Sequence, residues 1–302
     1  MLEAIIISGA ITGLIFAIVS LGFTLIYGIS GIVNLAHGAF FVIGAYLYGV
    51  LLHYLSSQIP SDLSYSIPAF ATILSVLLTG IIGMIFYRVT LHHLLGAEVS
   101  ILVVSICSCI IIQQIFFVTM GPIFATSYSI PVLVSGSIKI LNTEVLLGKV
   151  IAALISLSAF IVLALFISKT KTGRAMKALS QDLEAAMLVG INTGKLYMLT
   201  SAVSAGLASL GGILYTSTVT LSVGSFMWLL GLAIAFTVVV LGGLGSIKGS
   251  LAGGLILGLA QVAVMRILPG TGVLQDSIPF IVVILSLIVR PKGIFGKKIE
   301  ME

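Results

Sequence analysis

Charged residues are scarce in this sequence. Only 8% of the 302 residues are Asp, Glu, Lys or Arg, and none of these occurs from residue 4 to 61, 99 to 138 or 196 to 247. Soluble domains carry about 25% charged residues, so a soluble protein is excluded. Carboxylates are absent from the long apolar runs, so the chain lacks the intramembrane acids from which pumps build proton relays. The net charge of +5 comes from clusters beside apolar runs and does not indicate binding to nucleic acid.

Cysteines and catalytic clusters are equally scarce. The two cysteines, Cys107 and Cys109, point to nearly opposite sides of a helix, which argues against a mutual disulfide or a shared metal site. We interpret them as packing residues. His92 and His93 are adjacent and diverge in the same way, so we predict no metal site. Lys248 lacks the preceding Gly and following Ser or Thr of a phosphate-binding loop. We therefore expect a protein that is not an enzyme and has no cofactor or nucleotide site of its own.

Long apolar runs fill the chain instead. Hydrophobic residues make up 59% of it, and a helix needs about 20 apolar residues to cross a bilayer. The predicted fold class is all-α: one polytopic membrane domain, residues 1–302, with eight or nine transmembrane helices. The expected spans cover residues 4–27, a run from the following turn to about 54, 67–87, 100–119, 145–167, 196–215, a run that ends within 241–254, a run from there to about 265, and 278–289.

Basic residues between and after these spans predict the orientation. Arg290, Lys292, Lys297 and Lys298 near the end place the C-terminus in the cytoplasm. Nine crossings would then place the N-terminus outside. We expect residues 121–144 to form a polar external segment, and the Ser- and Thr-rich residues 216–225 to enter the membrane partway. The chain is thus predicted to be a multi-pass protein of the cytoplasmic (inner) membrane.

Glycines interrupt the apolar sequence at residues 27–47, where Asn34, His37 and Gly38 follow one another closely. Irregular backbone at membrane depth is tolerated only when it is buried in protein or faces a water-filled cavity. One hypothesis places these three residues on the substrate path. The other is that the His37 side chain is simply hydrogen-bonded to nearby backbone.

A second glycine-rich stretch covers residues 241–254. Its glycines, spaced for close helix packing, are Gly242, Gly245, Gly249 and Gly253. Glycines at 28, 31 and 44 recur 214 positions later at 242, 245 and 258 (242 − 28 = 245 − 31 = 258 − 44). Transporters are often built from internal repeats, so this recurrence suggests two related halves.

The longest polar interruption, residues 169–195, carries five basic residues against two acidic ones. This excess of Lys and Arg places the loop in the cytoplasm. Apolar residues recur in it at helical spacing and predict a surface helix with an apolar stripe: Met176, Leu179, Leu183, Ala186 and Met187. Gly190 falls where this helix would stop. The stripe either packs on the chain's own membrane helices or docks on a soluble partner.

Several motifs together resemble the integral-membrane permease subunit of ATP-binding-cassette importers for branched-chain amino acids. They follow the order of that family and extend over essentially the whole chain. They are Tyr27-Gly28 with Asn34-Leu35-Ala36-His37-Gly38, Glu184-Ala185-Ala186 with Gly190, the residues from Val240 to Ser246, and the closing residues from Arg290 to Gly296.

The resemblance implies a mechanism and a set of partners. In such importers the Glu-Ala-Ala loop forms a cytoplasmic coupling helix, so Glu184, Ala185, Ala186 and Gly190 would contact the ATPase. The Ile-x-Leu-Pro ending that many ABC importers carry after this Gly is absent here. The implied partners are a second, homologous permease subunit, two ATP-binding subunits that hold ATP and Mg²⁺, an extracytoplasmic solute-binding protein, and membrane lipid.

Two alternatives stay open at this point. One is a permease of the same family that carries urea or short amides on the same scaffold. A self-contained channel or ion-coupled carrier is the other alternative, although the lack of intramembrane carboxylates disfavours ion coupling.

Overall fold

Helices form most of the chain in the computed structural model, which describes residues 2–58, 66–124, 136–141, 143–218, 227–268, 277–290 and 293–296. The helices are α1 (Leu2–Ser30), α2 (His37–Gln58), α3 (Ile67–Val89), the 3₁₀ helix η2 (Leu91–Leu94), α4 (Glu98–Phe124), α5 (Leu147–Lys169), α6 (Lys171–Leu179), α7 (Leu183–Leu188), α8 (Thr193–Thr218), α9 (Met227–Gly242), α10 (Ile247–Ile267) and α12 (Ile278–Val289). The strands are β1 (Ser137–Ile140) and β2 (Thr143–Leu146).

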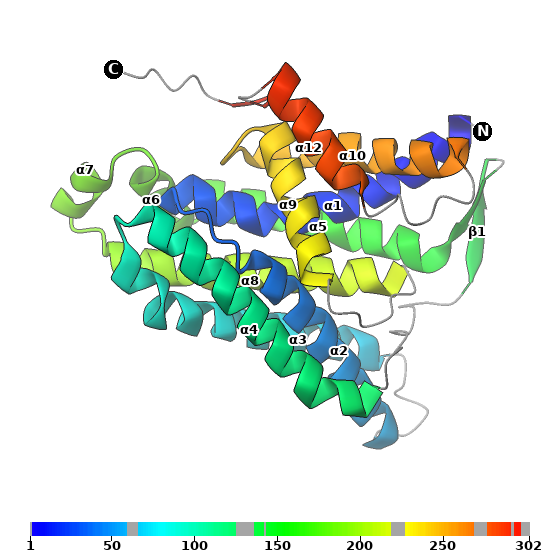
Figure 1. Cartoon of the computed structure of the whole chain (residues 1–302), viewed down its shortest axis with the longest axis horizontal. Helices are drawn as coiled ribbons and strands as arrows, with labels where there is room; N and C mark the ends of the chain where they lie inside the picture. Colours follow the sequence, from blue (N-terminus) through cyan, green and yellow to red (C-terminus); the bar gives the residue numbers. More distant parts are fainter. Residues whose placement is uncertain are drawn as a thin grey trace.

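Seven helices are long and apolar enough to cross a membrane, namely α1, α2, α3, α4, α5, α8 and α10. Two shorter apolar helices, α9 and α12, accompany them. This agrees with the predicted polytopic α-helical fold of eight or nine spans. The N-terminal end of α1 and the strands lie at the opposite end of the bundle from α7 (Figure 1). Residues 59–65 and 269–276, which lie between expected spans, residues 125–135 of the expected external segment, and most of the predicted partial entry at 216–225 lie outside the described residues.

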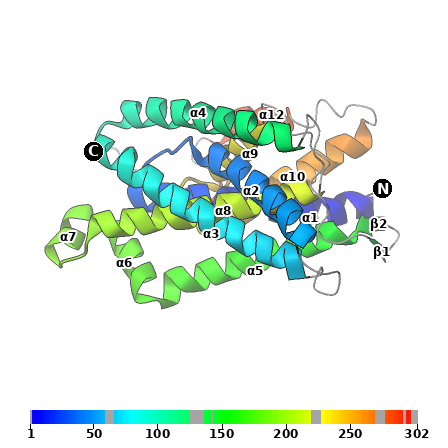
Figure 2. The same ribbon diagram turned by 90° about the horizontal axis from the view of Figure 1, so that it is seen from below.

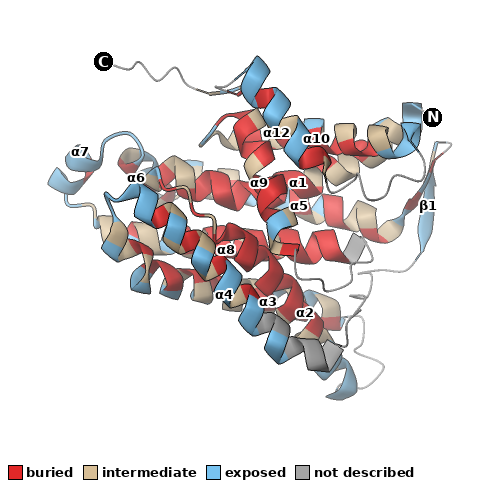
Figure 3. Ribbon diagram, in the orientation of Figure 1, coloured by how far each residue is buried: buried red, intermediate tan, exposed pale blue. Residues whose placement is uncertain are grey.

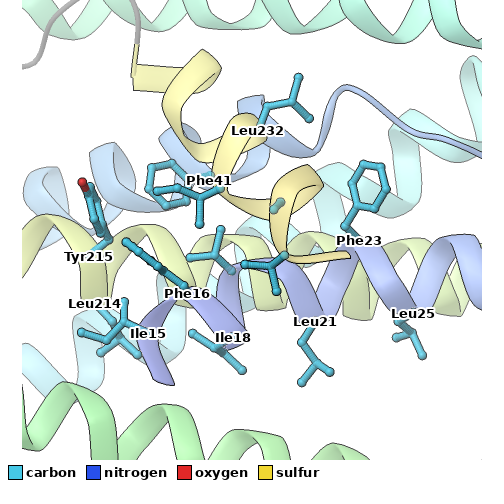
Figure 4. Packing of buried hydrophobic residues seen from close by; sticks show 14 of the residues in the cluster. Ile15, Phe16, Ile18, Leu21, Phe23, Leu25, Phe41, Leu214, Tyr215 and Leu232 are labelled. Carbon is cyan, nitrogen blue, oxygen red and sulfur yellow. The ribbon is translucent and has the colours of Figure 1, made fainter. Parts of the chain in front are cut away.

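Helix α1 is the centre of the bundle and contacts α5, α8, α9 and α10. Its glycines allow α10 to approach closely: a Cβ on Gly13 would lie 2.7 Å from Leu255 Cα, and one on Gly254 would lie 2.7 Å from Ala17 N. The small-residue spacing of Gly9 and Gly13 therefore marks a helix contact, as packing at membrane depth requires. Large side chains of α1 pack on other neighbours: Phe16 lies beside Tyr215 of α8 and Phe23 beside Phe236 of α9 (Figure 4).

The outer helices leave much of their surface uncovered. Only 22% of the spanning window is buried in α4 and in α5, against 61% in α2 and α8. Figure 2 shows α4 and α5 at opposite edges, with α2 and α8 between them. Large apolar side chains are exposed on the outer helices, such as Ile111 on α4 and Val162 on α5. Figure 3 shows exposed stretches along α4 in pale blue. Such a surface suits contact with lipid or with another membrane chain.

Polar side chains join helices inside the bundle. Ser201 Oγ on α8 donates to the Gly83 carbonyl on α3 at 2.8 Å, and Thr237 Oγ1 on α9 donates to the Pro279 carbonyl of α12 at 2.8 Å. Thr24 and Ser250 form a hydroxyl–hydroxyl bond between α1 and α10. Hydrogen bonds of this kind add to packing where the hydrophobic effect between helices is weak.

Only parts of the expected external segment 121–144 are described, namely residues 121–124, 136–141 and 143–144. Helix α4 continues to Phe124, and residues 137–146 form an antiparallel hairpin in which Ile138 is opposite Val145. Ser137 Oγ donates to Glu144 Oε1 at 2.6 Å across this hairpin. The apolar residues of the hairpin alternate over only four positions a strand, which is too short for the period of two to stand out in the sequence.

Candidate functional site

Helix α6 begins with a tight reversal at the end of α5. The Gly173 N–H donates to Thr170 Oγ1 at 2.9 Å, which satisfies one of the free N–H groups of the first turn. A Cβ on Gly173 would lie 2.5 Å from Ile167 Cα, so only glycine permits this approach of the two helices. Met176 and Leu179 are then buried against the bundle. The first half of the apolar stripe therefore packs on the chain's own membrane helices.

The single helix predicted within residues 169–195, ending at Gly190, is wrong in one respect, because the structure breaks it into α6 and α7. Asp182 lies between them with extended backbone, and its Oδ1 accepts from the Ala185 N–H at 2.9 Å. Asp competes with the backbone for hydrogen bonds in mid-helix and is favoured as an N-cap. A new helix therefore begins at Leu183.

Gly190 ends α7, as predicted. Its φ is +82°, and its N–H donates to the Met187 carbonyl at 3.0 Å. The Ile191 N–H donates to the Ala186 carbonyl at 3.1 Å, which completes a Schellman motif. Nothing lies within 4 Å of a Cβ built on Gly190, so the requirement for glycine here is conformational rather than steric.

Helix α7 carries three of the four predicted coupling residues and presents most of its surface to solvent (Figure 3). Ala186 is buried, whereas Glu184 and Ala185 are exposed. Leu183 and Met187, the second half of the apolar stripe, are 43% and 49% exposed, and Leu188 is 87% exposed. Figures 1 and 2 show α7 projecting beyond the helix bundle. This part of the stripe has an apolar surface that its own chain leaves largely uncovered.

Asn34, His37 and Gly38 lie together at the start of α2, in the interior. Asn34 Oδ1 accepts from the Ala36 N–H at 3.1 Å, which fixes the turn before the helix. His37 Nε2 is 2.8 Å from the Val19 carbonyl, and because a carbonyl can only accept, Nε2 is the donor. The backbone hydrogen bond expected for His37 is therefore present. Gly38 lies against the Trp228 carbonyl of α9.

Contacts of His37 with α1 and of Gly38 with α9 hold the α1–α2 turn in place. The ring of His37 meets Phe23 edge-on, with 5.7 Å between ring centroids, and only 1% of His37 is exposed. His37 Nδ1 has no hydrogen-bond partner among the described residues. The three cavities described below are lined by other residues. A place on the substrate path stays a prediction for Asn34, His37 and Gly38.

The glycines of 241–254 lie where α9 and α10 meet. A Cβ on Gly253 would lie 2.5 Å from the Val238 carbonyl oxygen, and one on Gly249 would lie 2.7 Å from the Gly242 carbonyl carbon. Gly245 has a φ of +78°, and a Cβ there would lie 3.2 Å from Gly28 Cα. Two stretches with similar glycine spacing thus meet at one end of the bundle, next to α6.

Two adjoining recesses lie at this end. The larger, about 620 Å³, is formed by the end of α1, the α6–α7 turn, the α9–α10 turn and Phe295. The smaller, about 460 Å³, adds the start of α4. Tyr27, Leu183 and Tyr197 line both. A third, apolar recess of about 380 Å³ lies between α3 and α8 in their spans.

Sequence reasoning assigned no role to Leu244 and Phe295, which line the larger recess. Each is an apolar residue in a short connecting segment, where polar residues are usual. That feature of the sequence could have indicated an interaction surface. The described residues contain no group of three or more His, Cys, Asp or Glu side chains that could hold a metal ion.

An α-helical bundle with seven helices long and apolar enough to cross a membrane defines a polytopic membrane protein. The chain belongs to the family described as branched-chain amino acid transport system, permease component, whose pattern matches residues 5–287.

Curated relatives match along almost their whole length. The high-affinity branched-chain amino acid transport permease BraD of Pseudomonas aeruginosa is 31% identical over 97% of this chain and 95% of its own. The corresponding LivH protein of Salmonella typhimurium is 29% identical over 96% and 94%. A probable LivH protein of Methanocaldococcus jannaschii is 26% identical over 97% and 93%. No solved structure matches the chain.

Proposed function

We propose that this chain is a permease subunit of an ATP-binding-cassette importer and forms part of the path by which branched-chain amino acids cross the cytoplasmic membrane. The family match over residues 5–287 carries this proposal. The names of the curated relatives support the substrate class, because BraD and LivH are named as high-affinity branched-chain amino acid permeases.

The end that carries α7 faces the cytoplasm in this proposal. Eight described basic residues lie at that end: Arg88, Lys169, Lys171, Arg174, Lys177, Lys195, Lys248 and Arg290. Three lie at the other end: Lys139, Lys149 and Arg266. Segments rich in Lys and Arg beside membrane spans stay inside the cell. The C-terminus is then cytoplasmic and the N-terminus external.

Separate subunits supply the energy. The surroundings of Lys248 do not match a phosphate-binding loop, so ATP and Mg²⁺ are bound by two cytoplasmic ATP-binding subunits. Helix α7 docks on them through Glu184, Ala185 and its exposed apolar side chains. The Asp182 cap and the Gly190 stop give this helix defined ends, and the buried Met176 and Leu179 tie it through α6 to the membrane helices.

The remaining partners are a second, homologous permease subunit, which covers part of the exposed membrane face, and an external solute-binding protein that delivers the amino acid. Asn34, His37 and Gly38 lie at the α1–α2 turn. We assign them a place on or near the substrate path.

Reconstitution tests the proposal. The chain, its second permease subunit and the ATP-binding subunits are placed in liposomes with the binding protein, and uptake of labelled leucine, isoleucine and valine is measured. ATP-dependent uptake that stops when the ATP-binding subunits are omitted is the expected result. Uptake by this chain alone without ATP would instead identify a self-contained channel or carrier, and uptake of urea in place of leucine would identify the related amide permease.

A further inference from the structure

Three exposed apolar side chains face the larger recess at the α7 end, and they come from three different segments. Leu183 begins α7, Leu244 lies in the turn between α9 and α10, and Phe295 follows α12. They are 43%, 46% and 50% exposed. All three lie in connecting segments rather than in spans, so contact with the hydrocarbon core does not explain them. Exposed apolar clusters in such positions mark interaction surfaces.

The backbone around Phe295 is fixed. The Ile294 N–H donates to the Leu241 carbonyl and the Phe295 N–H to the Gly242 carbonyl, both at 2.9 Å. These carbonyls end α9 and have no partner within that helix. Positive φ angles at Gly243 and Gly293 allow the two backbones to approach, and a Cβ on Gly293 would lie 2.5 Å from Gly243 N. We call residues 293–296 the C-terminal clip.

The clip connects the recess to α9 and α12. It is bonded to the last turn of α9 and follows α12, whereas α7 is joined through short turns to α6 and α8. Leu183 and Phe295 line the same recess of about 620 Å³. A side chain inserted there would touch both sets of helices at once.

The surroundings of the recess describe the chemistry of its occupant. Exposed charges flank it in the sequence on each contributing segment: Lys177, Asp182 and Glu184 near Leu183, Lys248 after Leu244, and Arg290 before Phe295. Polar side chains also line it, among them Ser180 and Ser246. An apolar centre within a polar and charged rim is the usual anatomy of a protein interface. This mixed rim favours a partner surface that presents an apolar side chain flanked by charges of both signs, basic opposite Asp182 and Glu184 and acidic opposite the three cations.

We propose that the ATP-binding subunit docks on this chain at two places, on α7 and on the C-terminal clip with Leu244, and inserts an apolar side chain into the recess between them. This inference rests on the proposed function, since it assigns further contact residues to the same partner. Movement of the ATP-binding subunit then acts on α9 and α12 through the clip, as well as on α6 and α8 through α7.

Binding of the cognate ATP-binding subunit to the detergent-solubilised permease pair tests the proposal. Phe295→Ser and Leu244→Ser should each weaken binding about tenfold or more, as loss of a central apolar anchor does. Phe295→Leu should retain most of the affinity. The matched control is Leu141→Ser, at the opposite end of the molecule, where the leucine is 71% exposed. This control should bind like the original protein.

A crosslinking measurement avoids any effect of a substitution on folding. Benzoylphenylalanine, a photoreactive amino acid, replaces Phe295 in one sample and Leu141 in another, and both are irradiated in the assembled complex. Crosslinks from position 295, but not 141, to the ATP-binding subunit are expected. Crosslinks from position 295 to lipid or to another permease chain instead would overturn the inference.

The outcomes separate this inference from the proposed function. If the unmodified chain binds no ATP-binding subunit, the proposed function fails. If it binds one, and the Phe295→Ser and Leu244→Ser variants bind it equally well, only the two-place docking fails.

Discussion

Gly242 and Gly249 lie against each other where α9 turns into α10. A Cβ on Gly242 would lie 2.9 Å from Gly249 Cα, and a Cβ on Gly249 would lie 2.7 Å from the Gly242 carbonyl carbon. Both atoms belong to backbone, which cannot move aside as the tip of a flexible side chain can. The pair therefore sets how sharply the chain reverses at this end of the bundle, and hence where Leu244 and the C-terminal clip lie.

Gly249→Ala is expected to destabilise the protein. The added methyl group must push the two helices apart, and overpacking of this kind costs about 1–3 kcal/mol. Thermal unfolding in detergent, followed by the loss of monodisperse protein, measures the effect as a lower midpoint. The matched control is Gly194→Ala in the first turn of α8, where the nearest atom to a built Cβ is 3.7 Å away. An unchanged midpoint for Gly249→Ala would show that the turn adapts.

Asp182→Ala is expected to loosen the beginning of α7. It removes the side chain that accepts from the Ala185 N–H, and loss of an N-cap costs about 1 kcal/mol. Because α7 has only six residues, this is enough to fray it. Hydrogen exchange of the amides of residues 183–189 should become faster. Asp182→Asn retains a capping oxygen and should exchange almost as the original protein does, whereas equal acceleration in both variants would implicate the charge instead.

The local features of this site were predictable because they depend on single residues. Gly190 stops α7 through a φ of +82°, which few other residues adopt. The break at Asp182 was missed although its signal was present. Leu179, Leu183 and Ala186 continue a spacing of three and four straight across the break, and that period outweighed the capping preference of Asp. The spacing of apolar residues indicates which face of a helix is apolar, but it does not indicate whether the helix is continuous.

The long-range features had no signal in the sequence. The clip is held to α9 by backbone hydrogen bonds from Ile294 and Phe295, which any residue except proline could make. Gly9 and Gly13 of α1, four residues apart, favour a close helix neighbour, but their spacing does not indicate that this neighbour is α10. The fold class was easier to predict than these contacts. The stretches without charged residues are long enough to contain helices that cross the hydrocarbon core of a membrane.

Glu184→Arg is expected to weaken binding of the ATP-binding subunit without changing the stability of the membrane domain. Glu184 is exposed on α7, so its replacement disturbs no packing within the chain. Reversal of a charge at an interface acts mainly through repulsion of the partner's complementary group. Pull-down with the tagged ATP-binding subunit should recover less protein, and Glu184→Gln should give an intermediate amount. Undiminished recovery of the Arg variant would place Glu184 outside the contact.

His37→Ala is expected to destabilise the bundle by about 2 kcal/mol or more, because it removes a buried ring and its hydrogen bond to Val19. His37→Gln keeps a donor that can reach the same carbonyl and should recover part of the loss. The unfolding midpoint and leucine uptake are measured for both variants. If His37→Ala leaves the midpoint unchanged but abolishes uptake, the side chain acts on the substrate path instead of in packing.

Gly190→Ala tests whether the exact end of α7 matters for coupling. The built Cβ has open space around it, so the only cost is that of placing a non-glycine residue at a φ of +82°, about 1–2 kcal/mol. Gly190→Asn should cost less, because Asn enters this conformation more readily. The membrane domain should unfold at its original temperature, since neither variant touches the core. Transport driven by the ATP-binding subunits should fall for Ala more than for Asn, measured as leucine taken up per ATP hydrolysed. If both variants retain the original ratio, then the Schellman motif serves only to end the helix, and the ATP-binding subunit holds α7 in place whatever its free conformation.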